Sequence, residues 1–141
     1  MKNKILPLLF LGIIFIAGCV LLGVKLELKS PQQDGFAKEN NYELKFEVIN
    51  PTTITFVGIV EYSYNGTCLK TDRNKDEIEI DPRKEKLVIK RFSSPQYRLS
   101  QYGSRPENYD GCLDTPHRIN VLLRDKGGEK KDTFDVSLII T

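Results

Sequence analysis

The chain has 141 residues, of which 40% are hydrophobic and 28% are charged, and its formal net charge is +2 at pH 7. This mixture excludes a disordered stalk, and the near-neutral charge lacks the basic excess of a nucleic-acid-binding protein. Four of the 21 basic residues and one of the 19 acidic residues precede Ser30, so the remainder has a net charge of −1. The part that follows the N-terminal apolar run has the length of one domain.

The first element is an uncharged apolar run over residues 5–24. About 20 helical residues at about 1.5 Å each span roughly 30 Å, the thickness of a bilayer's hydrocarbon core. Lys2 and Lys4 precede the run and favour a cytoplasmic N-terminus, although two lysines beyond the run weaken this asymmetry. We therefore expect residues 1–24 to be an uncleaved anchor in the cell membrane, with the lipid bilayer around residues 5–24. The C-terminal domain is then extracytoplasmic.

Two other interpretations of this segment stay open. The tetrapeptide that ends at Cys19 (Ile-Ala-Gly-Cys) resembles the bacterial lipobox, whose cysteine is lipidated and becomes the new N-terminus. Cys19 is therefore a candidate lipidation site. The small residues before Cys19 also suit cleavage of a secretory signal, but the apolar run continues past them to Val24. All three interpretations place the rest of the chain outside the cytoplasm.

The other two cysteines, Cys68 and Cys112, form an even pair in the exported part of the chain. In an oxidising compartment we expect a disulfide between them. It would close a loop of about 45 residues and stabilise the domain by about 4 kcal/mol in the chain-entropy model. The alternative is two buried free thiols. No metal site is expected, because two separate cysteines and one histidine provide no ligand cluster.

Beyond the anchor the sequence predicts short strands and no helix. Residues 24–29 alternate apolar and charged side chains, so the juxtamembrane segment (25–41) contains a candidate first strand. The rest of that segment, Ser30 to Asn41, is polar and rich in turn-forming residues, as in a loop. The main domain (42–141) is expected to place strands at residues 42–48, 53–64, 67–71, 77–80, 85–92, 118–124 and 133–140. Eight short strands with regular turn signals are typical of an antiparallel, immunoglobulin-like β-sandwich.

Three local signals refine this prediction. Asn50-Pro51 ends the strand that begins at Tyr42, since proline cannot donate to a ladder. Gly58, in the middle of a β-prone stretch, suggests a bulge or close packing. Asn65-Gly66 suits the two positive-φ positions of a type I′ hairpin turn. A second hairpin turn, between the last two strands, is expected at residues 125–128. Asn65 also begins an Asn-Gly-Thr sequon and is a candidate glycosylation site.

The stretch LKFEVINPTTITFVGIVEYSYNG resembles the domain of late-embryogenesis-abundant type 2 proteins, also called the water-stress and hypersensitive-response domain. The shared features are an apolar strand, an Asn-Pro turn, a second strand of apolar and small residues, and an Asn-Gly turn. The resemblance covers residues 42–92, and the cysteine-bearing stretch 93–116 has no counterpart in it. Other extracellular immunoglobulin-like modules share most of this pattern. Either resemblance implies a small, often membrane-tethered sandwich with stress-protective or binding roles and no enzymatic activity.

The sequence offers no catalytic or cofactor-binding residues. His117 is the only histidine and has no positioned nucleophile, so we expect a surface or strand-end residue. Residues 72–76 mimic the opening of a calcium loop but lack its glycine at the sixth position and its acid at the twelfth. We interpret them as a solvated charged turn. The expected protein is not an enzyme and carries no cofactor or metal.

The most informative part of the predicted domain is the long connection from Ser93 to His117. Most loops in compact domains have about 4 to 6 residues, and longer ones are usually functional or disordered. Tyrosines and arginines spaced by Ser, Gly and Asn are typical of recognition surfaces. The candidate partner-binding residues are Tyr97, Arg98, Tyr102, Arg105 and Tyr109. The alternative is a structural loop whose tyrosines pack on the sheet.

Two functions follow from these patterns. The first is a membrane-tethered, extracytoplasmic module for binding, adhesion or surface assembly, with an unidentified protein partner in the cell envelope. The second is a structural or stress-protective envelope protein without a specific ligand.

Overall fold

The computed structural model describes residues 23–94 and 109–141. The predictions about Cys19 and about most of the anchor lie outside these residues, as do those about Tyr97, Arg98, Tyr102 and Arg105. Within the two described ranges, no helix has the length and apolar character needed to cross a membrane.

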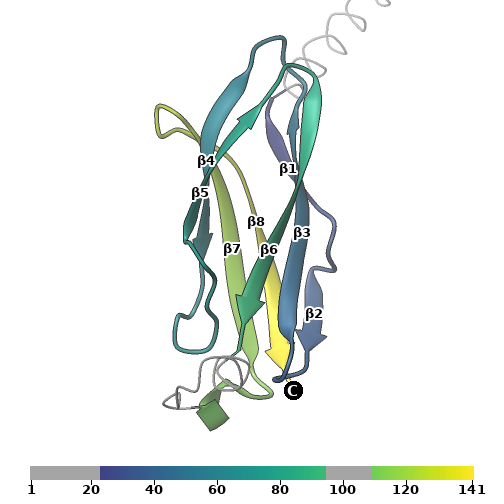
Figure 1. Cartoon of the computed structure of the whole chain (residues 1–141), viewed down its shortest axis with the longest axis vertical. Helices are drawn as coiled ribbons and strands as arrows, with labels where there is room; N and C mark the ends of the chain where they lie inside the picture. Colours follow the sequence, from purple (N-terminus) through teal and green to yellow (C-terminus); the bar gives the residue numbers. More distant parts are fainter. Residues whose placement is uncertain (1–22, 95–108) are drawn as a thin grey trace, which may run out of the picture.

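The described chain forms eight strands and a short 3₁₀ helix (Figure 1). The elements are β1 (Lys25–Leu28), β2 (Gln33–Phe36), β3 (Asn41–Asn50), β4 (Phe56–Ser63), β5 (Lys75–Ile80), β6 (Lys84–Ser93), η2 (Tyr109–Cys112), β7 (Pro116–Asp125) and β8 (Lys130–Ile140).

The strands form two sheets that face each other as a sandwich (Figure 1). One sheet has the order β1-β3-β6 and the other the order β2-β8-β7-β4-β5. All neighbouring strands are antiparallel except β2, which runs parallel to β8. The predicted all-β sandwich is therefore confirmed.

Alternation along the strands explains why the two sheets bury one face each. In β3, Tyr42, Leu44 and Phe46 are buried, while Glu43 and Lys45 between them are exposed. The same period of two recurs in β7 and β8, and the buried side chains of the two sheets meet in one core. Burying a side chain of this size stabilises the fold by about 1.5 to 3 kcal/mol.

The structure corrects the prediction for the juxtamembrane segment. Residues 33–36 are not part of a loop: they form β2, and Phe36 pairs with Ile140 at the end of β8. Because β1 also pairs with β3, the sandwich begins at Lys25, and the domain boundary predicted at residue 42 is wrong. The four residues of β2 (Gln-Asp-Gly-Phe) do not alternate between apolar and polar side chains, and the pairing of this strand is set by the distant β8.

The predicted hairpin at Asn65-Gly66 is also wrong. Neither residue has a positive φ, and the Asn65 carbonyl accepts hydrogen bonds from the amides of Cys68 and Leu69. The chain then leaves the sheet of β4 and crosses to the other sheet, where Lys70 pairs with Ser93. The predicted strand at 67–71 cannot form beside β4, because β5 and β7 already occupy both edges of β4.

The register places the two ends of the sandwich. Lys25 pairs with Ile49 near the end of β3, whereas Ser93 pairs with Asn41 at its start. A strand of ten residues at about 3.3 Å each is roughly 30 Å long. Gly23, near the end of the predicted anchor, therefore lies at the opposite end from the residues that flank 95–108 (Figure 1).

Candidate functional site

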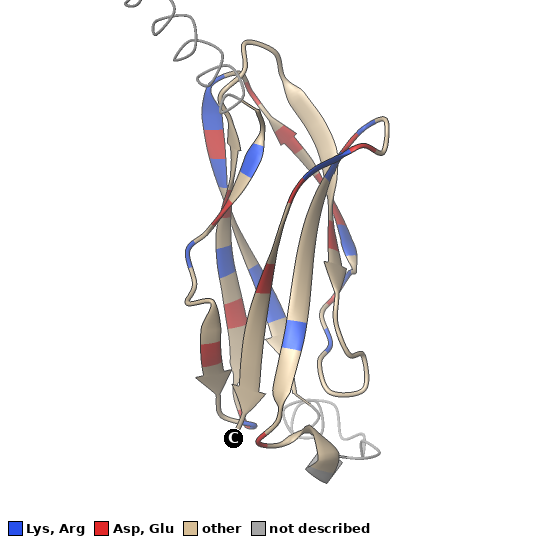
Figure 2. Ribbon diagram, turned by 180° about the vertical axis from the view of Figure 1, so that it is seen from behind, with Lys and Arg blue, Asp and Glu red and all other residues tan. Residues whose placement is uncertain are grey.

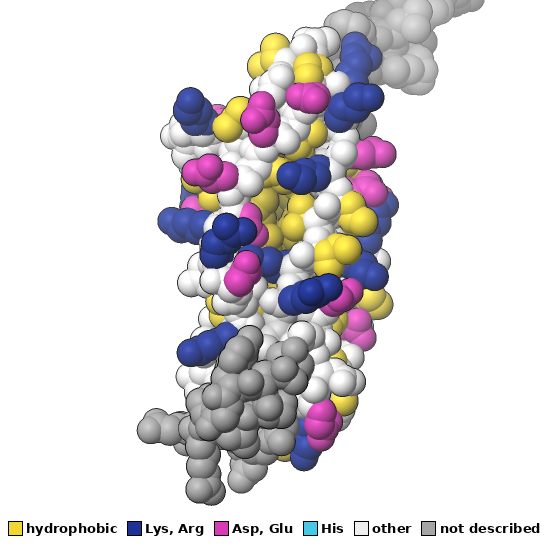
Figure 3. Space-filling view, viewed as in Figure 1, with side chains coloured by type: hydrophobic (Ala, Val, Ile, Leu, Met, Phe, Trp, Pro, Cys, Tyr) yellow, Lys and Arg dark blue, Asp and Glu magenta, His cyan; other side chains and the backbone are white. Residues whose placement is uncertain are grey.

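One side of the sandwich is open between the edge strands of its two sheets. β6 ends one sheet and β5 ends the other, and a cleft of about 1080 Å³ lies between them. The connection from β4 to β5 contributes residues 70–73 to its wall. Figure 3 shows a hollow on this side with hydrophobic side chains at its bottom and charged side chains around it.

Lys90 of β6 lies in the floor of the cleft with only 5% of its surface exposed. Its Nζ donates to Asp72 Oδ1 at 2.8 Å and to Asp76 Oδ2 at 2.9 Å. The same atom lies 4.7 Å from the centre of the Tyr62 ring, in cation–π geometry. The ammonium group is thereby held by two carboxylates and an aromatic face, which offsets the cost of its burial.

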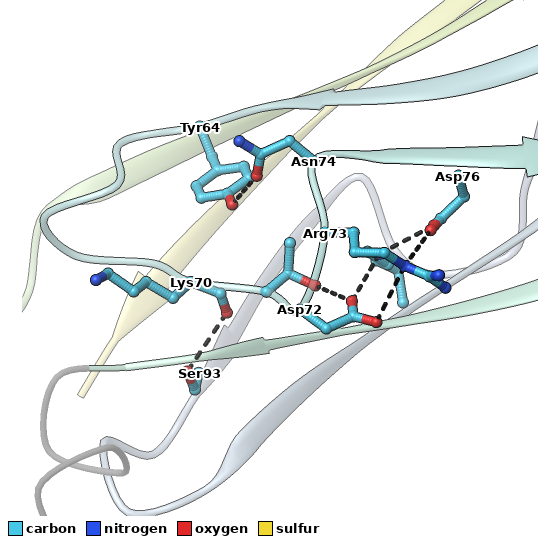
Figure 4. A network of polar contacts seen from close by, with 9 residues as sticks. Tyr64, Lys70, Asp72, Arg73, Asn74, Asp76 and Ser93 are labelled. Atoms are coloured by element: carbon cyan, nitrogen blue, oxygen red, sulfur yellow. Dashed lines mark hydrogen bonds and ion pairs between the residues drawn. The ribbon is translucent and has the colours of Figure 1, made fainter.

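Arg73 completes this charge cluster, defined here as Asp72, Arg73, Asp76 and Lys90. Its Nε lies 3.3 Å from Asp76 Oδ1 and 3.7 Å from Asp72 Oδ2 (Figure 4). The hydrogen bond from Lys90 lowers the pKa of Asp72 to about 2. Burial, followed by the Asp76 carboxylate, raises the pKa of Tyr62. The cluster holds two cations and two carboxylates, so it stabilises the cleft floor and activates no nucleophile.

The sequence interpretation of residues 72–76 as a solvated turn missed this cluster. The sequence of β6 did point to it, because apolar–polar alternation places Lys90 among the inward-facing residues, between Val88 and Phe92. An inward lysine needs an acidic partner, and the charged turn supplies two.

The rim of the cleft on β6 is apolar. Leu87 and Ile89 expose 54% and 49% of their surfaces. They alternate with the inward row and lie between Glu85 and Arg91 on the outer face of the sheet. Arg91 Nε donates to Glu43 of β3 at 3.1 Å, an ion pair exposed to solvent.

The structure joins Cys68 to Cys112, as expected from the sequence, with their Cα atoms 5.4 Å apart. The bridge ties the connection after β4 to η2. Tyr109 is the first residue of η2, and the other four candidate partner-binding residues lie outside the described part of the chain. Asn65 is exposed, with its Oδ1 accepting a hydrogen bond from the Thr67 amide. Its glycosylation stays a prediction.

His117 lies at the start of β7, as expected for a strand-end residue, but it is not on the surface. It is 6% exposed, and its Nε2–H donates to the Cys112 carbonyl at 2.7 Å, beside the disulfide. The burial of His117 is difficult to predict, because its carbonyl acceptor belongs to η2, a separate element. This histidine supports the fold next to the bridge.

The charges over the rest of the surface are mixed. Basic and acidic residues alternate along the outer strands and do not gather in one patch (Figure 2). Among residues 23–94 and 109–141, no group of three or more His, Cys, Asp or Glu side chains could hold a metal ion.

No protein-family model matches the chain. No curated protein matches it either. The resemblance to late-embryogenesis-abundant type 2 proteins thus gains no support.

Solved structures do match. The crystal structure of the CARDB domain of the PF1109 protein from Pyrococcus furiosus, in complex with di-metal ions, gives a TM-score of 0.50 at 18% identity and covers 84% of this chain and 94% of that chain. The solution NMR structure of the same domain gives a TM-score of 0.50 at 18% identity and covers 83% and 94%. A FixG-related protein from Vibrio parahaemolyticus gives a TM-score of 0.45 at 15% identity and covers 70% and 75%. The CARDB matches show that the chain has an immunoglobulin-like β-sandwich fold.

Proposed function

We propose that this protein is a non-catalytic assembly module of the cell envelope, anchored in the membrane by residues 5–24. It binds protein partners through the open side of the sandwich, along β6. The observation that carries this proposal is the exposed apolar pair Leu87 and Ile89, which lies on an edge strand beside a cleft. Apolar side chains that gather on an exposed edge are typical of interaction sites.

A protein partner fits this surface better than a small charged ligand or a nucleic acid. The charged side chains in the cleft floor already form ion pairs with one another, so they attract a small ion only weakly. The net charge of −1 beyond Ser30 offers no attraction to a phosphate backbone. An edge strand offers backbone amides and carbonyls to an extended segment of another chain, with specificity from neighbouring side chains.

The second part of the proposed binding surface is the stretch with Tyr97, Arg98, Tyr102, Arg105 and Tyr109. Its flanking residues lie at the end of the sandwich away from Gly23, which supports a surface presented away from the membrane.

Site-specific photo-crosslinking in intact membranes tests the proposal. A benzophenone amino acid at Leu87 should yield discrete adducts with protein, whereas the same probe at Lys130, an exposed residue at the start of β8, should yield none. Flotation of the full chain with membranes tests the anchor separately. Equal labelling at both positions would contradict a specific surface. It would favour the second function, a stress-protective envelope protein without a ligand.

A further inference from the structure

The four outer strands of the two sheets differ in how they are protected. An unprotected edge is a template for pairing with another chain, so proteins keep edges short, charged or covered. β1 and β2 have four residues each, and the Leu26 amide of β1 donates to Asp132 Oδ2 at 2.8 Å. β5 exposes Glu77 and Glu79 on its outer row. β6 has ten residues with two apolar ones in the middle of its outer row, and among the strands of residues 23–94 and 109–141 it is the unprotected edge.

The hydrogen bonds show which residues of β6 face away from its sheet. The amide and carbonyl of Ser93 both bond to Lys70, on the side away from β3. Backbone groups alternate sides along a strand, so Glu85, Leu87, Ile89 and Arg91 also direct their amides and carbonyls to the free edge. These four residues have their side chains exposed on the outer face.

This outer row is complementary to itself. If a second β6 runs antiparallel with its centre opposite Val88, Glu85 faces Arg91 of the second copy and Leu87 faces Ile89. The residues that face each other are then opposite charges or apolar pairs, the combinations that stabilise neighbouring strands. Shifting the centre to Leu87 sets Glu85 against Ile89, and shifting it to Ile89 sets Leu87 against Arg91. Of these three registers, only the one centred on Val88 gives every residue of the outer row a favourable partner.

Both ends of this row are bounded. The Lys70–Ser93 bridge occupies the edge just beyond Arg91, and Arg83 just before the strand has a φ of 59°, outside the strand conformation. On the inner row, Lys86 would face Lys90 of the second copy. Asp72 and Asp76 already neutralise Lys90, so this contact carries little repulsion.

The other free long edge does not share this property. The outer row of β5 is Lys75, Glu77 and Glu79. In an antiparallel pair of β5 strands centred on Glu77 or on Ile78, a glutamate faces a glutamate of the second copy. Like charges directly opposite one another destabilise such pairs.

We propose that the partner of β6 is a second copy of this chain, paired edge to edge across a two-fold axis at Val88. This deepens the proposed function by naming the partner, and it rests on the proposed anchor. Antiparallel pairing places the Lys25 ends of the two sandwiches at opposite ends of the dimer. Because β1 begins one residue after Val24, the dimer joins copies held in two facing membranes.

An edge contact of four residue pairs is small and weak between isolated copies. Many copies displayed on two facing membranes engage together, so the overall attachment is far stronger than one pair. Adhesion of membranes is therefore the measurable consequence.

Charge reversal in the full chain, reconstituted into vesicles, tests the register. Wild-type vesicles should aggregate, as followed by light scattering. Glu85→Arg sets arginine against arginine and Arg91→Glu sets glutamate against glutamate, so either variant alone should aggregate about tenfold more slowly. Mixing the two vesicle populations restores both opposite-charge pairs and should restore aggregation. Lys45→Glu, a reversal on the outer face of β3, is the control and should behave as wild type. Thermal melts establish that all variants fold.

Cysteine crosslinking tests the contact without vesicles. In detergent-solubilised full chain, Val88→Cys should form a dimer whose non-reducing peptide map contains a link between two copies of residue 88. Glu85→Cys places its two thiols about 20 Å apart in this register and should not link. Absence of the residue 88 link, or no rescue in the mixed vesicles, would overturn the self-pairing. A photo-adduct from Leu87 to a different protein would then still support the proposed function.

A residue 88 link that forms without any vesicle aggregation would overturn the facing-membrane arrangement. Flotation distinguishes that result from failure of the anchor, because a chain without an anchor would not float with the vesicles.

Discussion

At the scale of single residues, Lys90 decides the character of the open side of the sandwich. Burying an unpaired ammonium group is costly, and removing one partner of a buried ion pair leaves the charge of the other partner uncompensated. Here Asp76 is mostly buried while the side chain of Asp72 is 68% exposed. Solvent therefore screens part of the cluster, and its contribution to stability lies between that of an exposed pair and that of a buried pair.

Replacing Lys90 with methionine should lower the free energy of unfolding by about 2 kcal/mol, because Asp72 and Asp76 lose their shared cation. The matched control is Arg91→Met on the next position of β6. Arg91 pairs with Glu43 in solvent, so this change should cost about 0.5 kcal/mol or less. Urea denaturation measures both. Equal losses would show that the cluster does not stabilise the fold.

The ion pair between Asp72 and Lys90 should make the stability of the fold depend on pH. The pKa of Asp72 is lowered from 3.8 to about 2 in the folded protein, with Lys90 as the main cause. A lowered pKa means that the stability is present above pH 3.8 and is lost as the pH falls toward 2. The stability difference between wild type and Asp72→Asn should therefore shrink between about pH 4 and pH 2. A difference that stays constant over this window would contradict the ion pair.

At the scale of strands, Gly58 shows how tightly β4 packs against its neighbours. A Cβ atom at this position would lie 2.3 Å from the Arg124 carbonyl oxygen and 2.6 Å from the Phe56 ring. The sequence suggested a bulge or close packing, and the structure shows close packing. A backbone oxygen cannot move aside as a flexible side chain can.

Gly58→Ala should therefore destabilise the domain by about 2 kcal/mol through overpacking. Gly66→Ala is the control, since no atom lies within 4 Å of its added Cβ and its φ is not positive. That change should stay within about 0.5 kcal/mol. Thermal melts of the two variants distinguish packing from a general effect of losing glycine.

Strands with clear alternation, such as β3 and β7, could be predicted from the sequence, as could the hairpin turn at residues 125–128. What could not be predicted depended on distant partners. Asn65-Gly66 has the composition of a hairpin turn, but the neighbours of β4 exclude the return strand. Asn50 shows the same dependence: its buried amide donates to the carbonyls of Ile54 and Ile80, so the Asn-Pro turn is fixed by another strand's end. The charge cluster joins Lys90 of β6 to Asp72 in the β4–β5 connection and to Asp76 in β5, which lie 18 and 14 residues away, a contact that alternation alone does not reveal.

At the scale of the whole molecule, the bridge between Cys68 and Cys112 closes the end of the sandwich opposite Gly23. It spans a sequence separation of 44 residues. Constraining a loop of that size reduces the entropy of the unfolded chain and should stabilise the fold by about 4 kcal/mol.

The double variant Cys68→Ser/Cys112→Ser should lose that amount in urea denaturation, and reductant should affect the wild type but not the variant. Non-reducing peptide mapping of the full chain checks the pairing itself. Stability that is unchanged by reductant would contradict a bridge between these two residues.

The parallel pairing of β2 with β8 has a consequence for how the chain folds. Gln33 at the start of β2 lies against Ser137 near the end of β8, so one edge of the larger sheet needs the second and the last strands of the domain. The β7–β8 hairpin can form locally, but β2 has no sheet to join until β8 has been synthesised. Contacts of such long sequence separation slow folding. Completion of the sandwich must therefore follow the synthesis of β8 and its exit from the ribosome and, for an exported chain, its passage through the translocation channel.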